Sequence, residues 1–172
     1  MDRLASWRLT GVMTSSDALL ADSVLAAATL VTGLQAGTYF TWATGVMPGL
    51  ARVDDRTFVE AMQRVNVAIV NPVFVSTFLG GPLLAGAAAV TADGPARPWA
   101  IAGTVLAVAT VVITAVGNIP LNNALDAAGP VDRVNGLAAV RAAFEPRWVR
   151  LNVLRSLTSA GALACLSWAA SR

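Results

Sequence analysis

The stretch PWAIAGTVLAVATVVITAVGNIPLNNAL, residues 98–125, contains 28 residues without a formal charge. A helix of about 20 apolar residues is long enough to cross the hydrocarbon layer of a membrane. Three more uncharged stretches occur, of 29 residues after Asp22, 28 after Arg64 and 16 after Arg155. We therefore predict an all-α integral membrane protein of one domain, folded as an antiparallel four-helix bundle. Its membrane helices are expected at about 23–46, 73–91, 99–117 and 148–170.

The composition of the 172-residue chain agrees with a membrane location. Only 13% of the residues are charged, whereas a soluble domain has about 25%. The chain has no His and no Lys, and Cys165 is its single cysteine. These absences exclude a Ser-His-Asp triad, Schiff-base chemistry, an intrachain disulfide and Cys-rich metal sites. We expect the lipid bilayer as surrounding, and no metal, no cofactor and no nucleic-acid partner.

The first predicted helix has an alternative interpretation as a secretory signal peptide. Arg3 and Arg8 precede it, and Ala26, Ala27 and Ala28 resemble a cleavage site. The uncharged run continues for about 20 residues beyond these alanines, which is too long for a signal h-region of about 7 to 15 residues. We interpret the segment as a retained membrane helix.

The connections between the predicted helices differ in length. Residues 91–98 form a tight turn, whereas the connections 47–72 and 118–147 are long. Each long connection is predicted to contain a short amphipathic helix. The first helix would be capped by Asp54 or Asp55 and would bury Phe58, Ala61, Met62, Val65 and Ile69. The second would be capped by Asp132, would contain Val134, Leu137, Ala138 and Val140, and would end before Pro146.

Arginines are distributed unevenly between the two ends of the predicted bundle. The end with the long connections carries Arg52, Arg56, Arg64, Arg133, Arg141 and Arg147. The other end carries Arg3, Arg8, Arg97 and Arg172. By the positive-inside rule, the long connections face the cytoplasm. We expect a multi-pass protein of a bacterial-type cytoplasmic membrane.

Polar and aromatic side chains share one face of the fourth predicted helix. Trp148, Asn152 and Arg155 follow i, i+4, i+7 spacing, and Ser159 continues the same face. A charge inside the membrane costs about 2.5 to 3.5 kcal/mol, so Arg155 marks a candidate functional site. The alternative is that the Arg155 side chain extends to the lipid headgroups.

The first predicted helix carries a second polar face. Gln35, Tyr39 and Trp42 follow i, i+4, i+7 spacing. This face either points into the bundle or contributes Tyr39 and Trp42 to an interfacial aromatic belt. The glutamine favours the inward orientation, because an amide is costly to expose to lipid.

A ridge of small residues runs along the same helix. Gly33, Gly37 and Thr41 recur every four residues, and Thr29 and Gly45 extend the ridge. Small residues at this spacing permit close helix approach in lipid. The ridge therefore serves packing within the bundle or a homo-oligomer interface.

Asparagines gather at the helix ends that adjoin the long connections. Asn66 and Asn71 precede the second predicted helix, and Asn118 and Asn122 follow the third. Asparagines at such positions often serve only as caps and turn residues. Their placement at the same end as Arg155 predicts a membrane pocket lined by amides, aromatic rings and one cation.

Such a pocket suits a flat, oxygenated aromatic ligand. Rings stack on aromatic side chains, amides bond carbonyls and phenols, and a guanidinium stabilises a phenolate. An electron-rich phenolic carbanion reacts with oxygen once it is deprotonated, so the substrate itself supplies the electrons. The base would be a carboxylate, with Asp126 and Glu145 nearest the polar end, or else Tyr39 or water.

Several short motifs in order resemble the anthrone oxygenase-like family of small membrane proteins. They are Gly37-Thr-Tyr-Phe-Thr-Trp42, Val46-Met-Pro-Gly-Leu50, Met62-Gln63 with Asn66, Asn71-Pro72, Asn118-Ile-Pro-Leu-Asn122, and Trp148 with Asn152 and Arg155. The resemblance implies a four-helix membrane bundle and, from members known in polyketide pathways, oxidation of anthrones to anthraquinones without an added cofactor. Relatives are associated with coupling of reactive aromatic intermediates. The chain departs from any family mechanism that uses a histidine base.

Our hypothesis is a membrane-embedded enzyme of aromatic polyketide or antibiotic biosynthesis. It would catalyse cofactor-independent anthrone-type oxygenation or stereoselective coupling of two aromatic units. Catalytic roles are predicted for Arg155, Asn152, Asn118 and Tyr39, and contacts with a planar aromatic substrate for Trp42, Gln35, Asn66, Asn71, Asn122 and Trp148. The alternative is a non-catalytic membrane assembly or export subunit that associates through the Gly33, Gly37 and Thr41 ridge.

Overall fold

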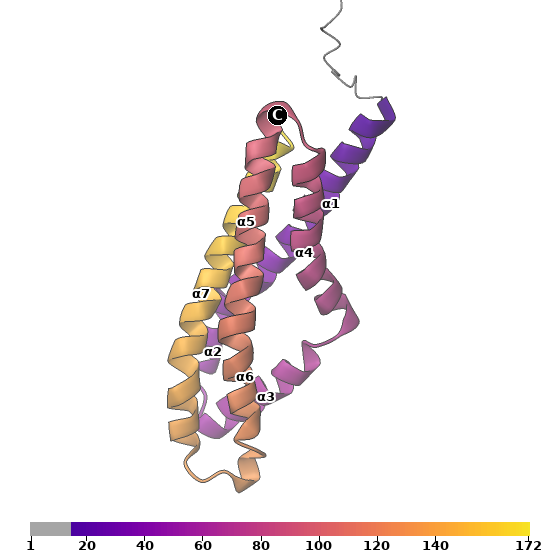
Figure 1. Cartoon of the computed structure of the whole chain (residues 1–172). Coiled ribbons are helices and arrows are strands. Elements are labelled where there is room, and N and C mark those ends of the chain that lie inside the picture. Colours follow the sequence, from indigo (N-terminus) through magenta and orange to yellow (C-terminus); the bar gives the residue numbers. More distant parts are fainter. Residues whose placement is uncertain (1–14) are drawn as a thin grey trace, which may run out of the picture.

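The computed structural model describes residues 15–172, and this part consists of helices and their connections (Figure 1). The all-α prediction is therefore confirmed. Arg3 and Arg8 lie outside the described residues. In chain order the elements are α1 (Ser15–Thr41), η1 (Trp42–Val46), α2 (Met47–Leu50), α3 (Asp55–Ala68), α4 (Pro72–Thr91), η2 (Gly94–Ala96), α5 (Arg97–Ile113), η3 (Thr114–Asn118), α6 (Ile119–Ala127), η4 (Val131–Arg133) and α7 (Leu137–Ala169).

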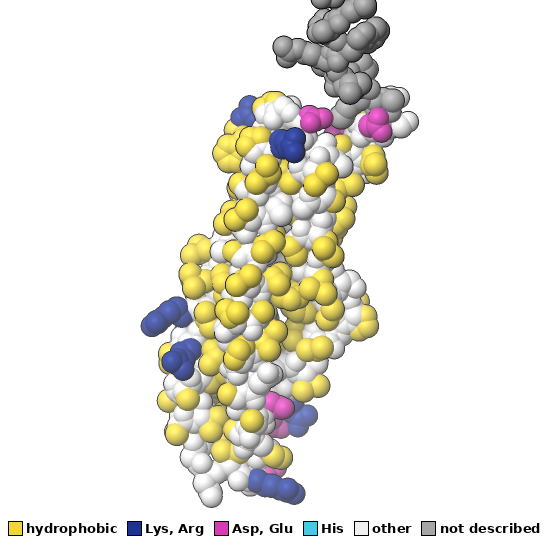
Figure 2. All heavy atoms as spheres, in the orientation of Figure 1, with side chains coloured by type: hydrophobic (Ala, Val, Ile, Leu, Met, Phe, Trp, Pro, Cys, Tyr) yellow, Lys and Arg dark blue, Asp and Glu magenta, His cyan; other side chains and the backbone are white. Residues whose placement is uncertain are grey.

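Three helical stretches of the described chain are long and apolar enough to cross a membrane: Ser15–Leu50, Pro72–Thr91 and Gly94–Ala127. They correspond to the first three predicted membrane helices. Large apolar side chains on them, Leu30 and Leu83 for example, are exposed. Figure 2 shows apolar side chains over most of the upper half and the middle of this face, and charged side chains at the top and through the lower half. Such a surface is the one expected of a protein embedded in lipid.

The fourth predicted membrane helix, 148–170, is the second part of α7, a helix of 33 residues. α7 packs against α1 and α5, and α4 packs against the same two helices. The four long helices thus form one packed group. α7 is long enough to cross a membrane but is less apolar than these three stretches, because residues such as Asn152 and Arg155 lower its hydropathy.

The helices extend beyond three of the predicted membrane spans, the first, the third and the fourth. α1 begins at Ser15 rather than near residue 23, and the third helix continues as α5, η3 and α6 to Ala127 rather than ending near 117. Charges delimit the part of a helix that suits hydrocarbon, but they do not end a helix at the water interface. In the second long connection, the predicted short helix ending before Pro146 does not exist. Asp132 lies in the 3-10 turn η4, and α7 begins after Gly136 and runs through Pro146.

Packing explains why α7 continues through a proline. A proline inside a helix removes one backbone hydrogen bond and displaces the carbonyl four residues earlier. Phe144 and Trp148, on either side of Pro146, are both buried in the same apolar cluster, and their rings are 6.2 Å apart. Burial of two aromatic side chains stabilises the segment by several kcal/mol, on the order of the cost of the proline.

The short helix predicted in the first long connection is confirmed as α3. Asp54 is its N-cap, and its carboxylate accepts hydrogen bonds from Thr57 N and Thr57 Oγ1 at 3.0 and 2.6 Å. These bonds hold the pKa of Asp54 below its usual value. The cap therefore persists above the ordinary aspartate pKa and is lost as the pH falls through the lowered pKa. Phe58, Val59 and Met62 form the buried face of α3.

Two π turns, η1 and η3, occupy matching positions in the first and third spans. η1 precedes Pro48 and η3 precedes Pro120. A proline lacks the N–H that would bond the carbonyl four residues earlier. In both turns the last N–H before the proline, that of Met47 or Ile119, donates to a carbonyl five residues back. π turns of this kind often occur at functional sites, because they re-aim the side chains that follow.

Glycine packing gives a direct test of the helix arrangement. A methyl group at Gly103 would lie 2.9 Å from Leu166 Cγ and 3.3 Å from the Ala162 carbonyl oxygen, so α5 and α7 would have to separate. We expect Gly103→Ala to destabilise the protein by about 1 to 3 kcal/mol through overpacking. Thermal unfolding in detergent measures this effect as a lower Tm.

Gly37 supplies the matched control, because a methyl group there meets nothing within 4 Å. Alanine is favoured over glycine in a helix by about 1 kcal/mol, so Gly37→Ala should keep or raise the Tm. Equal Tm values for Gly103→Ala and the unmodified protein would contradict the close packing of α5 on α7.

Candidate functional site

A cavity of about 340 Å³ lies at the end of the bundle that carries the long connections. Its walls come from α1, η1, α3, α4, η3, α6 and α7. Of the predicted site residues, the cavity is lined by Tyr39, Trp42, Asn66, Asn122, Trp148 and Arg155. Apolar side chains, Phe74 and Phe78 among them, form most of the remaining wall. The structure therefore brings together residues from four separate parts of the chain around one cavity.

Arg155 is buried in the wall of this cavity, with 6% of its surface exposed. It does not extend to the surface, as the headgroup alternative required. Its Nη2 donates to Asn152 Oδ1 at 2.8 Å, and its Nε has no hydrogen-bond partner. The guanidinium carbon lies 4.6 Å from the centre of the Tyr39 ring and 5.1 Å from that of Trp148.

Within residues 15–172, no carboxylate forms an ion pair with Arg155; the ion pairs of this part involve Arg56, Arg64 and Arg141. Within this part of the chain, the Arg155 guanidinium contacts two aromatic faces and one amide oxygen. Cation–π contacts of this kind contribute about 2 kcal/mol when desolvated, well short of the cost of burying an unpaired charge. The cavity consequently has a strong electrostatic preference for an anion.

Asn152 does not line the cavity, but its side chain positions Arg155 through a hydrogen bond. The amide is fully buried; Nδ2 donates to the Tyr39 carbonyl oxygen at 3.1 Å, and Oδ1 accepts from Arg155. Since the oxygen is engaged by a cation and the nitrogen by a carbonyl, the orientation of the amide is fixed. Asn152 thus joins α7 to α1 and positions the guanidinium.

Two tryptophans and an asparagine form a connected aromatic wall. The rings of Trp42 and Trp148 are 5.3 Å apart and inclined at 58°. Trp148 Nε1 donates to Asn122 Oδ1 at 3.0 Å, which satisfies the indole and orients the amide. Trp148 therefore contacts Trp42 and the Arg155 guanidinium and is hydrogen-bonded to α6. This wall presents ring faces to a planar molecule.

Five of the predicted site residues keep unpaired polar atoms in buried positions: Gln35, Tyr39, Asn66, Asn118 and Arg155. Tyr39 Oη and Asn66 Nδ2 belong to side chains that line the cavity and have no hydrogen-bond partner. Asn118 is 1% exposed, and neither its Oδ1 nor its Nδ2 is bonded, but it does not line the cavity. Buried polar groups are costly without a partner, so Tyr39 and Asn66 retain unused hydrogen-bonding capacity beside the cavity.

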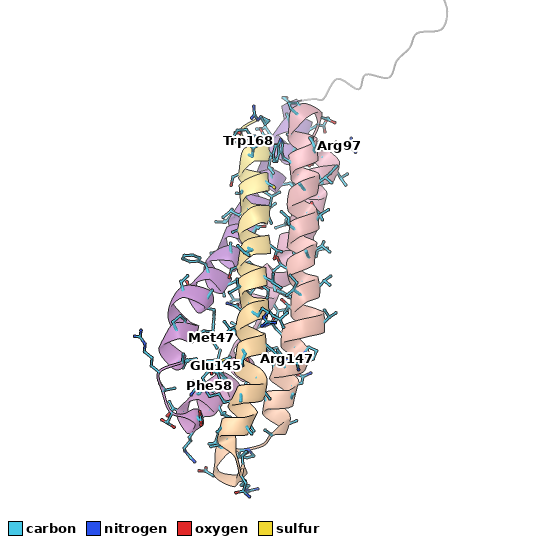
Figure 3. All side chains as sticks on the ribbon, turned by 90° about the vertical axis from the view of Figure 1, so that its left-hand side faces the viewer. Met47, Phe58, Arg97, Glu145, Arg147 and Trp168 are labelled. Carbon is cyan, nitrogen blue, oxygen red and sulfur yellow. The ribbon has the colours of Figure 1, made fainter. Side chains whose placement is uncertain are left out.

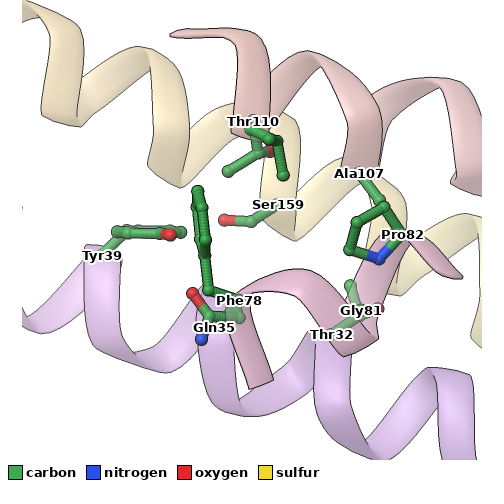
Figure 4. A pocket seen from close by; sticks show the side chains of 10 residues that line it. Thr32, Gln35, Tyr39, Phe78, Gly81, Pro82, Ala107, Thr110 and Ser159 are labelled. Carbon is green, nitrogen blue, oxygen red and sulfur yellow. The ribbon is translucent and has the colours of Figure 1, made fainter. Parts of the chain in front are cut away.

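Gln35 and Asn71 do not line this cavity. Gln35 Nε2 donates to Thr77 Oγ1 at 2.7 Å, and Gln35 borders a separate chamber of about 20 Å³ that Tyr39 and Phe78 also line (Figure 4). Asn71 is the exposed N-cap of α4, where its Oδ1 accepts from Phe74 N at 3.0 Å. Asn71 therefore has the capping role that the sequence left open as the alternative.

The carboxylates named as candidate bases are also absent from the cavity wall. Glu145 accepts from Arg141 Nε at 2.7 Å, and Asp126 is exposed on α6. No Asp or Glu lines the cavity. Among the side chains of the wall, only Tyr39 has an ionisable hydroxyl. Residues 15–172 also contain no group of three or more His, Cys, Asp or Glu side chains that could hold a metal ion.

The sequence pattern did not identify Phe74, Phe78 or Thr114 as parts of the wall. Phe74 and Phe78 stack at 5.8 Å on one face of α4. α4 is apolar on all sides, so its sequence carries no periodic signal that separates the cavity face from the lipid face. Their i, i+4 spacing on an otherwise aliphatic helix was the only available sign.

Residues 15–172 thus define a class: an apolar helical protein with three candidate membrane spans and a largely apolar cavity lined by one cation without an ion pair. The chain belongs to the anthrone oxygenase family, since the family model described as Anthrone oxygenase matches residues 61–165. The match confirms the resemblance and includes Asn66, Asn122, Trp148, Asn152 and Arg155. Tyr39 and Trp42 precede the matched segment. No curated protein and no solved structure matches the chain.

The stability of two variants tests whether Arg155 is a ligand-binding group and Asn152 its support. Arg155→Met removes a buried charge that has no counter-charge, so the Tm should be equal or higher. Asn152→Leu removes the hydrogen bonds to the Tyr39 carbonyl and from Arg155 Nη2, and a buried group left unsatisfied costs about 1 to 3 kcal/mol, so the Tm should fall. Both values come from thermal unfolding of the purified protein in the same detergent.

A large loss of stability in Arg155→Met would instead assign Arg155 a structural role. An unchanged Tm in Asn152→Leu would contradict the positioning role of Asn152.

Proposed function

We propose that the protein is a membrane-embedded biosynthetic enzyme that binds a planar, oxygenated aromatic polyketide as its anion. The reaction is cofactor-independent anthrone-type oxygenation or stereoselective coupling of two aromatic units. One observation carries the proposal: the Arg155 guanidinium is buried beside an apolar cavity without a carboxylate partner in the described chain. Membership of the anthrone oxygenase family supports the same class of substrate.

The cavity supports this substrate class by size and by lining. Its volume of about 340 Å³ falls within the usual range of ligand pockets, about 300 to 1,000 Å³. Trp42, Trp148 and Phe74 offer faces for stacking. Tyr39 and Asn66 offer unpaired polar atoms to the oxygen substituents of the ring system. Arg155 lies where it stabilises a negative charge on one of those oxygens.

For oxygenation, the substrate supplies the electrons. Loss of a proton from the central CH₂ of an anthrone gives an anion whose charge is delocalised onto oxygen, and Arg155 stabilises this anion. The anion gives one electron to O₂, the resulting radical and superoxide form a C–O bond, and protonation yields a hydroperoxide. Loss of water then leaves the quinone carbonyl. The proton of the first step goes to water or to the phenolate form of Tyr39, since no carboxylate lines the cavity.

For coupling, two aromatic radicals join. Each substrate anion loses one electron to O₂, and the two radicals form a carbon–carbon bond. Stereoselectivity then requires that one face of each ring be shielded, which the Trp42 and Trp148 wall provides for a substrate stacked on it. In both reactions Asn152 positions Arg155.

The same proposal includes the arrangement in the membrane. We take α7 as the fourth membrane helix, antiparallel to its neighbours in a four-helix bundle, in a bacterial cytoplasmic membrane with the long connections toward the cytoplasm. Asn152, Arg155 and Ser159 are buried, so the side chains that lower the hydropathy of α7 face protein rather than lipid. Polar residues of membrane helices commonly face the bundle interior in this way.

A non-catalytic assembly subunit is the second candidate function. Part of the small-residue ridge is unoccupied, because a methyl group at Gly37 or Gly45 would meet nothing within 4 Å. Gly33 already faces Leu163, at 3.6 Å for an added methyl group. The open part of the ridge, with Thr41, is available to a second copy of the chain.

Turnover of an anthrone distinguishes the two functions. We expect the purified protein with an anthrone and O₂ to form the quinone, and Arg155→Met to lower kcat/KM by about 100-fold, because one electrostatic contact to the reacting anion is lost. Arg150→Met is the matched control, since Arg150 is exposed on the same helix and does not line the cavity. It should keep the rate of the unmodified protein.

Mass spectrometry of the product separates oxygenation of one substrate molecule from formation of a dimer. Equal rates for the protein, for Arg155→Met and for empty detergent would reject the oxygenase. If Gly37→Leu abolished an oligomer detected by native mass spectrometry while Arg155→Met kept all biological function, the assembly role would replace the enzyme.

A further inference from the structure

The water-facing end of the cavity is closed by side-chain packing. One apolar cluster contains Met47, Phe58, Met62, Leu125 and Phe144, and each of these five residues is at most 3% exposed. This cluster joins α2, α3, α6 and α7 below the cavity. Figure 3 shows Met47, Phe58 and Glu145 close together at this end, between the α2–α3 segment and α7. A ligand from water would have to separate these elements.

Hydrogen bonds and an ion pair also connect the elements at this end of the cavity. Gln63 Nε2 of α3 donates to the carbonyl oxygens of Leu125 and Gly129, both at 3.0 Å. Arg141 of α7 donates to the Val53 carbonyl oxygen at 2.8 Å and pairs with Asp55 at 3.1 Å. The α3 helix is thereby attached both to the end of α6 and to α7.

The side of the cavity between α4 and α6 is different. α4 packs against α1 and α5, whereas α6 packs against α3 and α7. In Figure 1 the first half of α4 turns away from the continuous α5–α6 helix. Four apolar residues line the cavity here and are exposed at the surface: Val70 at 73%, Val75 at 37%, Leu79 at 49% and Ile119 at 43%. The cavity wall on this side is therefore also the outer surface.

The sequence of α4 explains why its first half diverges. Pro82 lies inside the helix and has no N–H to donate to the carbonyl of Phe78, and Gly80 and Gly81 precede it. Proline and glycine together are the usual cause of a bend in a helix. The first half of α4, which carries Phe74 and Leu79, is thus joined to the second half where the backbone bonding is weakest.

From this asymmetry we propose that the cavity exchanges its ligand directly with the lipid, through an opening between α4 and α6 bordered by Val75, Leu79 and Ile119. The inference rests on the proposed function and narrows its substrate class. The substrate is a planar aromatic molecule dissolved in the bilayer, with one acidic hydroxyl for Arg155 and without sulfonate or sugar groups. Charged or sugar-bearing analogues lose favourable hydration when they pass the apolar residues around the opening, whereas the parent molecule does not.

Binding kinetics in lipid nanodiscs test the route. A monohydroxylated anthraquinone, which needs no turnover, is mixed with the protein, and the change in quinone absorbance as its phenol ionises beside Arg155 follows its arrival in the cavity. Varying the lipid-to-water ratio at constant total quinone separates the two sources. We expect the association rate to follow the quinone concentration in the lipid.

Two tryptophan substitutions form a matched pair on α4. Leu79→Trp narrows the opening and should slow association and dissociation by about tenfold each, with little change in Kd. Leu83→Trp adds the same bulk one turn further along, at a residue that is 72% exposed and does not line the cavity, and should keep the original rates. If Leu79→Trp does not fold, Val75→Trp provides the same obstruction.

Association rates that follow the aqueous quinone concentration, or equal rates for Leu79→Trp and Leu83→Trp, would overturn the lateral route while leaving the proposed function intact. Failure of the unmodified protein to bind the quinone at all would contradict the proposed function and the lateral route together.

Discussion

The ligand preference of the cavity depends on one buried guanidinium that has no counter-charge within residues 15–172. Arg155 lies within the packed group of long helices, 6% exposed, and its stabilising contacts are one amide oxygen and two aromatic rings. Burying an unpaired charge in an apolar interior costs free energy, and such charges in membrane helices mark functional sites. In the proposed function, an anionic ligand in the adjoining cavity offsets this cost.

The remaining features of the site hold that cation and shape the space beside it. Asn152 fixes the guanidinium and connects α7 to the Tyr39 carbonyl. Trp148 contacts Trp42 and bonds Asn122, so α1 and α6 are placed around the same cavity. The π turns before Pro48 and Pro120 widen both neighbouring helices at this level. A closed water end and an apolar outer rim then leave the lipid as the natural source of the ligand.

Regular helices explain what was predictable from the sequence. The face of Trp148, Asn152 and Arg155 followed from helical spacing, because α7 is regular there, and Asp54 identified the start of α3 through its cap. Helical spacing could not show that Gln35, one turn before Tyr39, lies beyond the cavity. It also could not show that Asn71 caps α4. The continuation of α7 through Pro146 depended on tertiary burial of Phe144 and Trp148, and the α4 wall lacked any periodic signal. The nature of the base also depended on which carboxylates reach the cavity, which spacing does not determine.

The charge of the bound ligand is the most direct test of this account. A monohydroxylated anthraquinone absorbs at longer wavelength when its phenol is ionised, so absorbance against pH gives the ionisation of the bound molecule. With Arg155 present, the bound phenol should ionise about one to three pH units below the free quinone in the same lipid, because a nearby cation favours the anion. In Arg155→Met this shift should vanish. An equal ionisation curve for both proteins would contradict the central role of the buried guanidinium.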